Sequence, residues 1–397
     1  MISKIINAFQ YLSKKIPAPF NRFATLRKFI PLRKLNIYNR NQSIRGYALL
    51  IYIAHPFYIK ENGPSFRAHI NVRNARLLVK VLNDLGYCVD VIDYQDKNFE
   101  SDKIYDIVIG IGGAFDSQKQ YLKNSKIKIY YATGMHYITE TNLIYQRHMN
   151  LRNRKGKFIS PKRINTPYFS PEKSDFIISV QNEFTNKTYS HLNVPLYSLT
   201  LSGDEPDSPQ NLLKTKNTKT ILWFSGPGMI LKGLDLVLDA VSQVKDCNLV
   251  ICANLFAEDE FKEIYSKELY DTSNITFQGF ADVGSLEFKK IITECVAVIY
   301  PYPEGEMSGS LMTCMNYGLI PIIAYFSNDE ISEFAEYVDG TVKGIKDTLI
   351  HFCKLSDDVI LEKSRKSLEY AQRYHSREKE YFDYKFALED IIEKTNL

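Results

Sequence analysis

Residues 295–326 read CVAVIYPYPEGEMSGSLMTCMNYGLIPIIAYF, and this stretch decides the fold. It begins with an unbroken apolar run, turns through a segment rich in Pro, Gly and Glu, and continues into small and apolar residues. A second apolar run, LIPIIAYF, follows Gly318. Continuous apolar strands separated by helices are typical of a parallel sheet that is covered on both faces. The stretch therefore predicts a strand, a helix over residues 309–317 and a second strand.

The same alternation occurs in two successive series along the chain. The first series contains the apolar runs YALLIYI, YCVDVID, YDIVIGIGG, KIKIYYATG and DFIISV, and a helical periodicity over residues 69–85 that ends at Gly86. A polar stretch without periodicity, residues 201–219, is typical of a linker. The second series contains KTILWFSG, CNLVICAN and NITFQGF, with helices predicted over residues 231–243 and 284–294.

Two such series predict an α/β fold of two Rossmann-like domains, whose parallel sheets face an interdomain cleft. We expect a basic N-terminal arm (1–46), an N-terminal domain (47–205) and a C-terminal domain (206–372). The charged stretch 358–394 contains no Pro or Gly. We therefore predict that it is helical and that its end, residues 373–397, packs back towards the N-terminal domain.

The composition is that of an ordinary globular protein. The chain has 397 residues, of which 45% are apolar and 24% are charged. Its six cysteines form no CxxC pair and no His/Cys cluster with the spacing of a zinc site. We expect buried, reduced thiols, no metal site and a reducing, cytoplasmic compartment.

The positive charge is concentrated at the N-terminus. Residues 1–46 contain ten Lys and Arg and no acid, whereas the rest of the chain carries 40 basic and 46 acidic residues. Within residues 1–34, apolar side chains recur at helical spacing beside lysines, as at Ile2, Ile5, Ile6, Phe9, Leu12 and Ile16. This pattern predicts a helix lying in the plane of an anionic membrane surface, and no run approaches the roughly 20 apolar residues needed to span a bilayer. Packing of the stripe on the protein's own surface is the alternative, and the acidic remainder of the chain argues against nucleic acid as a partner.

Three loops of the second series follow strands and lie where ligands bind in open α/β sheets. In SGPGMILKGLDL (225–236), Ser225, Gly226 and Gly228 allow close backbone approach, and Lys232 lies near a helix start, where a phosphate is favoured. In FQGFADV (277–283), Gly279 and the aromatic ring of Phe280 are available to a nucleotide base.

The third loop, PYPEGEMSGSLMTCM (301–315), again leads from a strand into a helix. Ser308 or Ser310 can cap the helix, and Gly309 allows a phosphate to approach its end. Glu304 or Glu306 can accept hydrogen bonds from sugar hydroxyls, and the sequence does not distinguish between these two carboxylates.

These loops, in this order, resemble the C-terminal domain of GT-B glycosyltransferases, in particular the retaining GT4-like family (glycosyltransferase group 1). The resemblance is carried by Lys232-Gly233, by Thr276-Phe277-Gln278-Gly279, and by Glu304-Gly305 leading to Gly318-Leu319-Ile320-Pro321. It covers residues 219–325 well and the N-terminal half less well. It implies that Lys232 binds the donor diphosphate, that Glu304 holds the donor sugar, and that the amides of Ser308 to Ser310 cradle the phosphate.

Two positions depart from the family pattern. A second glutamate that grips the nucleotide ribose is usual in the family, whereas this chain reads Met312-Thr313-Cys314 there. An arginine often precedes the lysine by five residues, and here that residue is Pro227. The departures leave open how the nucleotide ribose is recognised. They also leave open which residue, besides Lys232, would bind the diphosphate.

In the N-terminal half, the resemblance implies an acceptor side. We expect His69 and Asn71, which open a helix, Gly112 and Gly113, which end a strand, and Arg147 in a basic segment to lie on that side. His136 is the candidate for the histidine that approaches the donor sugar in related enzymes, so we group it with Glu304 and Lys232 as catalytic. A capping role for either histidine, and a solvated face for the basic segment, are the alternatives.

The implied activity moves a sugar from a nucleotide-sugar donor to a glycan or lipid-linked acceptor, with retention, in surface polysaccharide (lipopolysaccharide or capsule) synthesis. We expect a peripheral enzyme at the inner face of the cell membrane. No DxD motif lies at a strand end, so we expect neither an obligatory metal nor a cofactor beyond the nucleotide sugar. The alternatives are a GT-B-fold nucleotide-sugar epimerase or phosphorylase, and a catalytically degenerate nucleotide-sugar-binding partner.

Overall fold

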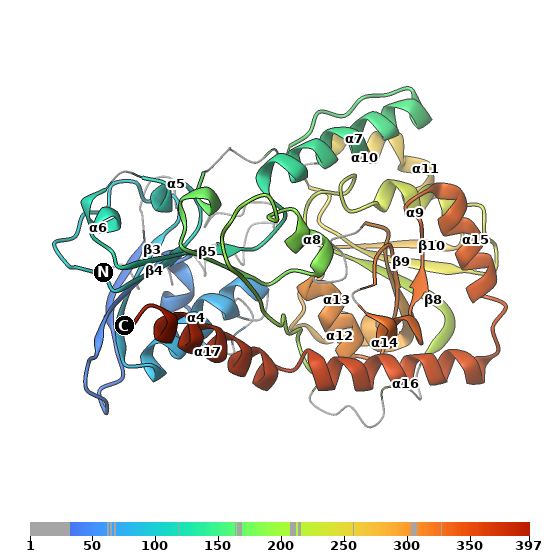
Figure 1. Ribbon diagram of the computed structural model, residues 1–397. Coiled ribbons are helices and arrows are strands. Elements are labelled where there is room, and N and C mark those ends of the chain that lie inside the picture. Colours follow the sequence, from blue (N-terminus) through green and yellow to red (C-terminus); the bar gives the residue numbers. More distant parts are fainter. Residues whose placement is uncertain are drawn as a thin grey trace.

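Two sheets of mainly parallel strands, each flanked by helices, lie side by side in the computed structural model (Figure 1). The structure describes residues 32–397 except 62, 64–65, 67–68, 118, 163, 165–168, 207–211, 213–215, 257, 303–307 and 327. The predicted α/β class with two parallel-sheet domains is confirmed.

The N-terminal lobe is built on a seven-stranded sheet in the order β1-β3-β2-β4-β5-β6-β7. Its strands are β1 (Arg33–Ile37), β2 (Gly46–Tyr52), β3 (Tyr87–Asp93), β4 (Ile107–Gly110), β5 (Ile127–Ala132), β6 (Phe176–Ser179) and β7 (Leu196–Ser198). Its helices are α4 (Ile70–Asp84), α5 (Gly112–Phe115), α6 (Gln120–Lys123), α7 (Tyr137–Lys155) and α8 (Glu183–Lys187), with 3-10 turns η1 (His55–Tyr58) and η2 (Pro171–Lys173).

The C-terminal lobe is built on a six-stranded sheet in the order β10-β9-β8-β11-β12-β13, and all its strand pairs are parallel. Its strands are β8 (Asn217–Phe224), β9 (Asn248–Cys252), β10 (Ile275–Gly279), β11 (Cys295–Tyr300), β12 (Ile320–Ile323) and β13 (Glu336–Tyr337). Its helices are α9 (Leu234–Val241), α10 (Asp259–Ile264), α11 (Ser266–Tyr270), α12 (Leu286–Glu294), α13 (Gly309–Asn316), α14 (Asp329–Ser332), α15 (Val342–Phe352) and α16 (Asp357–Tyr374).

Strand β1 lies within the stretch that the sequence assigns to the basic arm. It pairs antiparallel with β3 at the edge of the first sheet. Arg33 forms an ion pair of 2.6 Å with the buried Asp96, and the Asn36 amide donates to Asp90 Oδ1 at 2.7 Å. These buried carboxylates hold the strand in place, so the N-terminal lobe begins before residue 47. The preceding residues, 1–31, lie outside the described part of the chain.

The chain's last helix, α17 (Arg377–Lys394), returns to the N-terminal lobe (Figure 1). The charged stretch predicted as one helix is divided into α16 and α17, and Ser376 caps the second helix by accepting from the Lys379 amide. Apolar residues of α17 join the core under the first sheet, where the hydroxyls of Tyr384 and Tyr131 are 2.6 Å apart.

The interdomain linker is anchored where it leaves the first lobe. Arg73 of α4 donates to the carbonyls of Ser202 and Gly203 at 3.2 and 2.8 Å, and the Ser202 hydroxyl donates to Glu380 at 2.5 Å. Burial raises the pKa of the Glu380 carboxyl, while Ser202 and Arg73 oppose the rise. A Cβ atom on Gly203 would lie 2.2 Å from the Thr313 amide nitrogen, so the linker runs directly against α13.

Helix α7 follows β5 in the N-terminal lobe but packs on the C-terminal lobe (Figure 1). Leu151 of α7 and Ile159 beyond it are buried in the core cluster formed around β8, β9 and α9. The predicted domain boundary at residue 205 therefore does not separate the two cores, because this segment contributes to the second.

The cysteines are free thiols, and all of them except Cys353 are buried. Burial raises the pKa of the thiols of Cys88, Cys252, Cys295 and Cys314. Such thiols stay protonated and behave as small apolar side chains.

Replacing Leu388 on α17 tests the docking of this helix. Leu388 is 0% exposed, whereas Phe386 on the same helix is 70% exposed. Leu388→Ala should lower the free energy of unfolding by about 2–5 kcal/mol because it leaves a cavity in the core, and Phe386→Ala should change it by less than about 0.5 kcal/mol. Urea unfolding of both variants measures the difference, and equal midpoints would show that α17 does not contribute to this core.

Candidate functional site

The candidate site is built where β8 and β11, which are neighbours in the second sheet, reach their carboxyl ends. Tyr300, the last residue of β11, donates a hydrogen bond from its hydroxyl to the carbonyl of Phe224, the last residue of β8. Burial raises the pKa of Tyr300 well above its ordinary value, so its hydroxyl remains a donor. The loops that follow the two strands therefore start from a fixed, shared point.

The loop after β8 brings Lys232 back to the strand end. The Lys232 amide donates to the Gly228 carbonyl at 2.9 Å, and the Lys232 Nζ donates to the Ser225 hydroxyl at 2.8 Å. A Cβ atom on Gly226 would lie 3.8 Å from this Nζ, so the ammonium also lies beside the Gly226 backbone. The structure thus brings together Ser225, Gly226 and Lys232, three of the predicted donor-binding residues.

The loop after β11 leads to the N-terminus of α13. Ser308 is the cap, and its hydroxyl accepts from the Leu311 amide at 3.1 Å. The hydroxyls of Ser308 and Ser310 lie close enough to Tyr300 to oppose the rise of its pKa. The cap at Ser308 agrees with one of the two predicted options, and the predicted Glu304, Gly305 and Glu306 lie outside the described residues.

A close contact between Gly233 and Pro301 joins the two loops. Gly233 has a φ of +76°, and a Cβ atom there would lie 2.5 Å from Cγ of Pro301. Lys232 is therefore held against the loop that carries the start of α13.

The first turn of α13 also meets the first turn of α4 from the other lobe. A Cβ atom on Gly309 would lie 3.0 Å from the Ile70 side chain. His69 caps α4, with its Nδ1 accepting from the Asn71 amide at 3.2 Å. The predicted acceptor-side residues His69 and Asn71 thus lie near the predicted phosphate cradle, and two helix N-termini converge between the lobes. Helix N-termini carry partial positive charge and unpaired amides, which favour anions.

The loop after β10 presents an exposed ring. Gly279 has a φ of +81°, and its carbonyl accepts from the Ala253 amide at 2.8 Å. Phe280 is 64% exposed. This ring is accessible for stacking, as the sequence predicts for a nucleotide base.

Thr313 has a structural role. Its hydroxyl accepts from the Asp204 amide at 2.9 Å and donates to the Gly309 carbonyl at 2.7 Å. Met312 and Cys314 on either side are buried. At the position where the family often has a ribose-binding acid, this chain binds its own interdomain linker.

His136 is more enclosed than the sequence suggests. It precedes α7, is 1% exposed, and its Nε2 lies 3.2 Å from Glu172 Oε1. Its ring packs against Tyr189 and His191. Burial lowers the pKa of His136, and Glu172 opposes this effect. The ring therefore faces Glu172, which the sequence did not single out.

Gly112 and Gly113 are buried at the start of α5. Gly112 has a φ of +75°, and a Cβ atom there would lie 2.9 Å from the Tyr94 ring. Close packing explains the need for glycine at this position.

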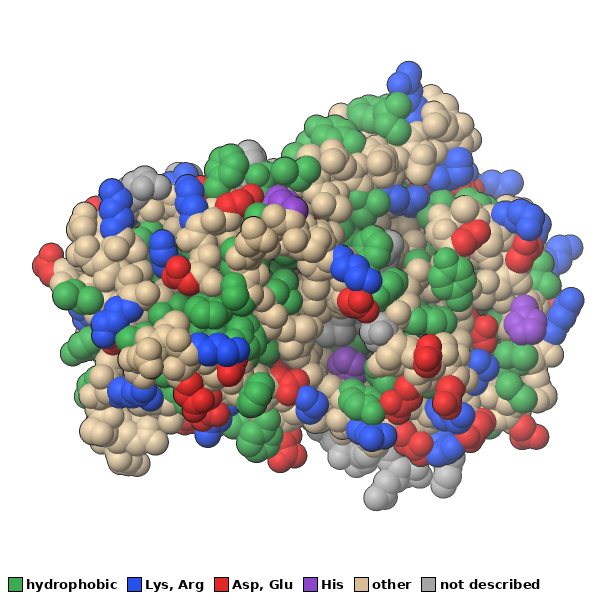
Figure 2. Space-filling model, in the orientation of Figure 1, with side chains coloured by type: hydrophobic (Ala, Val, Ile, Leu, Met, Phe, Trp, Pro, Cys, Tyr) green, Lys and Arg blue, Asp and Glu red, His purple; other side chains and the backbone are tan. Residues whose placement is uncertain are grey.

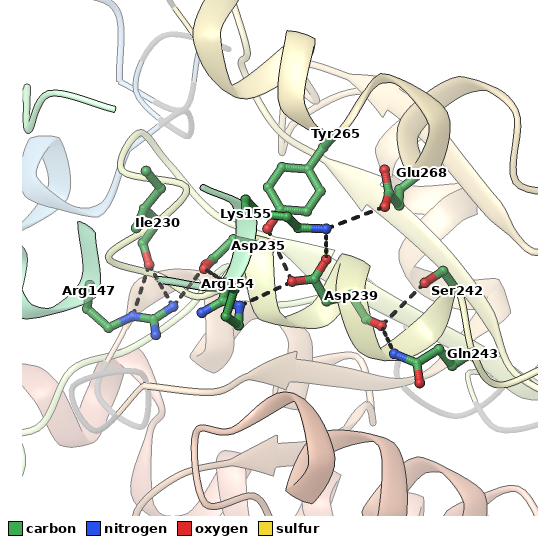
Figure 3. Close-up of polar contacts among 10 residues, drawn as sticks. All are labelled: Arg147, Arg154, Lys155, Ile230, Asp235, Asp239, Ser242, Gln243, Tyr265 and Glu268. Carbon is green, nitrogen blue, oxygen red and sulfur yellow. Dashed lines mark hydrogen bonds and ion pairs between the residues drawn. The ribbon is translucent and has the colours of Figure 1, made fainter. Parts of the chain in front are cut away.

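Arg147 of α7 binds the C-terminal lobe. Its guanidinium is held by the Ile230 carbonyl and by Asp235, a buried carboxylate in the first turn of α9 (Figure 3). Sequence reasoning missed Asp235, and the available signal was an acid two residues after Gly233 in a helix whose only other charged residue is Asp239.

A cavity of about 430 Å³ lies elsewhere, beside the ion pairs of Figure 3. Arg154, Lys155, Asp239 and Gln243 contribute to its lining, and the last two lie towards or beyond the carboxyl end of α9. Lys232 lies at the other end of this helix. The cavity is therefore separate from the candidate site, which lies at the ends of β8 and β11. The part of the chain described here contains no cluster of His, Cys, Asp and Glu that could hold a metal and no helix able to span a membrane.

No protein-family model matches this chain, and no curated protein matches its sequence. Solved structures do resemble it. The sucrose-phosphate synthase of Thermosynechococcus elongatus has a TM-score of 0.61 at 11% identity, covering 88% of this chain and 100% of that protein. HepE of Anabaena, solved with UDP-glucose, has a TM-score of 0.53 at 13% identity, with coverage of 88% and 100%.

WaaG, a glycosyltransferase involved in lipopolysaccharide biosynthesis, has a TM-score of 0.52 at 12% identity, covering 87% of this chain and 99% of WaaG. The chain spans 54% of the longer S. aureus TarM, whose TM-score of 0.46 supports no argument. Together with the two sheets, the likenesses to sucrose-phosphate synthase, HepE and WaaG define the class: the chain has the GT-B fold, as its sequence predicts.

Replacing Gly233 by alanine tests the contact between the two loops. Gly233→Ala introduces both a left-handed alanine and an overlap with Pro301, whereas Gly156→Ala introduces the left-handed alanine alone, with no atom within 4 Å. We expect a loss of about 1–2 kcal/mol of unfolding free energy for Gly156→Ala and at least about 1 kcal/mol more for Gly233→Ala. Equal losses in denaturant unfolding would refute the close approach of the loops.

Proposed function

We propose that this protein is a glycosyltransferase that moves a sugar from a nucleotide-sugar donor to a glycan or lipid-linked acceptor. The observation that carries the proposal is the convergence of Lys232, Ser225 and the N-terminus of α13 at the ends of two adjacent strands. A lysine ammonium and free helix amides form a binding site for a diphosphate. The N-terminus of α4 approaches the same place from the other lobe, where an acceptor would enter.

The mechanism follows from what this site can stabilise. When the anomeric carbon–oxygen bond breaks, negative charge develops on the leaving diphosphate, and Lys232 with the amides of Ser308 to Ser310 would stabilise that charge. Glu304 would position the sugar, whose ring carries the developing positive charge. His136, which is 1% exposed and faces Glu172, is too enclosed to contact the sugar in this arrangement of the chain. We propose no obligatory metal, because the ammonium and the helix N-terminus provide the positive charge. We propose retention of the anomeric configuration from the resemblance of the sequence to the GT4-like family.

The structural neighbours support the donor class. HepE was solved with UDP-glucose, and WaaG is described as a glycosyltransferase of lipopolysaccharide biosynthesis. By analogy we propose a nucleotide sugar as donor and a hexosyltransferase of the GT4-like type acting in surface polysaccharide synthesis.

A catalytically degenerate nucleotide-sugar-binding partner is the second candidate. It is favoured by Thr313, which binds the linker where the family often has a ribose-binding acid. Binding of a nucleotide sugar without hydrolysis or transfer would support this alternative over the transferase. We include an epimerase or phosphorylase in the same assay, since free epimerised sugar nucleotide or sugar phosphate would identify it.

We further propose that the protein acts at the inner face of the cell membrane, on a lipid-linked acceptor. The basic, amphipathic residues 1–34 support this, since such segments bind anionic lipid surfaces. Apolar side chains also gather over α7 (Figure 2), where Ile138, Tyr145 and Met149 are exposed at helical spacing.

Removing the Lys232 ammonium tests the donor site. After a thermal-shift screen of UDP- and GDP-sugars identifies a donor, Lys232→Met should lower transfer or donor hydrolysis by about 100-fold or more, because the leaving group loses its cation. Lys219→Met, at the exposed amino end of β8, removes the same charge and should retain activity. Near-normal turnover in Lys232→Met and in Glu304→Ala would refute the proposed site.

Deleting residues 1–31 tests membrane association. The deletion ends before β1, so the sheet edge formed by Arg33–Ile37 is kept. We expect the truncated protein to lose binding to vesicles that contain an anionic phospholipid, and the full chain with Lys4, Lys14 and Lys15 changed to Gln to bind more weakly than the unmodified one. Unchanged co-sedimentation of the truncated protein with these vesicles would contradict the proposal.

A further inference from the structure

We infer that Arg147 is a positioning residue, which holds the Lys232 turn in the geometry that binds the donor diphosphate. The inference rests on the proposed function of Lys232. It assigns Arg147 to the donor side, rather than to the acceptor contact that its basic segment suggests.

Arg147 forms hydrogen bonds to the chain on both sides of Lys232. Its Nε and one terminal nitrogen donate to the Ile230 carbonyl at 3.2 and 3.1 Å, and the same terminal nitrogen donates to Asp235 Oδ1 at 2.9 Å (Figure 3). Ile230 precedes Lys232 by two residues, and Asp235 follows it by three. One planar guanidinium therefore fixes the distance between the two ends of the turn.

The turn that carries Lys232 benefits from being held in place by Arg147, because it lies between two glycines in the left-handed region. Gly228 has a φ of +103° and Gly233 a φ of +76°. Glycine costs more backbone entropy to order than any other residue. The amides of Lys232 and Gly233 close the turn onto the carbonyls of Gly228 and Ile230, and the second of these carbonyls is the one that Arg147 holds.

Arg147 also neutralises part of the charge of the buried Asp235 carboxylate. Asp235 is 0% exposed, and its carboxylate is shared between Arg147 and Arg154, the latter at 2.5 Å. A buried carboxylate that loses one cationic partner is destabilised. Arg154 binds Asp235 and Asp239, whereas Arg147 also donates to a backbone carbonyl of the turn, that of Ile230.

Helix α7 gives Arg147 a rigid base. The helix has 19 residues, which corresponds to a length of about 28 Å. It begins just beyond β5 of the first sheet, and Leu151 anchors it in the core of the C-terminal lobe. Arg147 therefore holds the Lys232 turn from a helix that begins beside the first sheet and packs on the C-terminal lobe.

The test is a double-mutant cycle read by calorimetric binding of UDP and GDP, the two probes. For whichever nucleotide the full-length wild-type protein binds, Arg147→Met should weaken binding about 10-fold, because the ammonium is displaced from the diphosphate. If Arg147 acts through Lys232, adding Arg147→Met to a Lys232→Met protein should cause no further loss of nucleotide affinity, since the effects of coupled residues on binding are not additive. Lys157→Met removes an exposed ion pair between α7's end and Glu263 and should leave the affinity unchanged.

The outcomes separate the inference from the proposed function. If Lys232→Met weakens binding but Arg147→Met does not, or if the two losses add fully, the positioning role is overturned and the donor site stands. If neither nucleotide binds, or if Lys232→Met has no effect, the proposed function fails and the inference fails with it. Arg147→Lys is the second variant if Arg147→Met does not fold. The lysine ammonium in Arg147→Lys cannot bind the Ile230 carbonyl and Asp235 with the planar geometry of a guanidinium. Wild-type affinity in Arg147→Lys would therefore also overturn the positioning role of Arg147.

Discussion

The approach of Gly309 to Ile70 is the constraint on which the candidate site depends. No side chain fits at residue 309 without displacing the Ile70 side chain, since a Cβ atom would already lie 3.0 Å from it. The starts of α13 and α4 therefore come together, although they belong to different sheets. Lys232, which we propose as the cation of the donor site, lies on the neighbouring loop, where its Nζ donates to the Ser225 hydroxyl.

Two sets of contacts hold the lobes in the relation that this approach requires. On one side, the linker is bound by α4, α13 and α17, through the half-buried Arg73 and the buried Thr313 and Glu380. On the other side, α7 crosses to the C-terminal lobe and ends in the ion pairs with Asp235 and Asp239 (Figure 3). The first set is made mostly of hydrogen bonds to backbone, the second mostly of charge pairs. Salt should weaken the more exposed pairs of the second set before it affects the first.

Local patterns in the sequence were enough to predict the class of fold. Buried strands such as β8 and β11 read as continuous apolar runs, and the helices between them end at glycines or begin at caps, so the two parallel sheets could be derived. The grouping of Ser225, Lys232 and Ser308 also followed, because loops after parallel strands share one edge of a sheet. These inferences required only the pattern of adjacent residues and the rule that ligands bind beyond the carboxyl ends of parallel strands.

What could not be predicted depends on contacts between distant residues. Strand β1 was hidden in a basic segment, because its partners Asp90 and Asp96 lie more than 50 residues away. The crossing of α7, and so the place of Arg147, depends on Asp235, which is 88 residues distant. His136 next to Glu172, 36 residues on, is another such pair.

Thr313 shows how such a contact changes the meaning of a sequence departure. Its hydroxyl both accepts from the Asp204 amide and donates to the Gly309 carbonyl, and an ionised glutamate could do only the first. A longer side chain would also have to fit where the linker at Gly203 already lies against the backbone of α13. An ionised acid at this position would lose the hydrogen bond that Thr313 donates to the Gly309 carbonyl. The missing glutamate follows from how the two lobes are joined, and its absence alone is not evidence that the diphosphate end of the site has been lost.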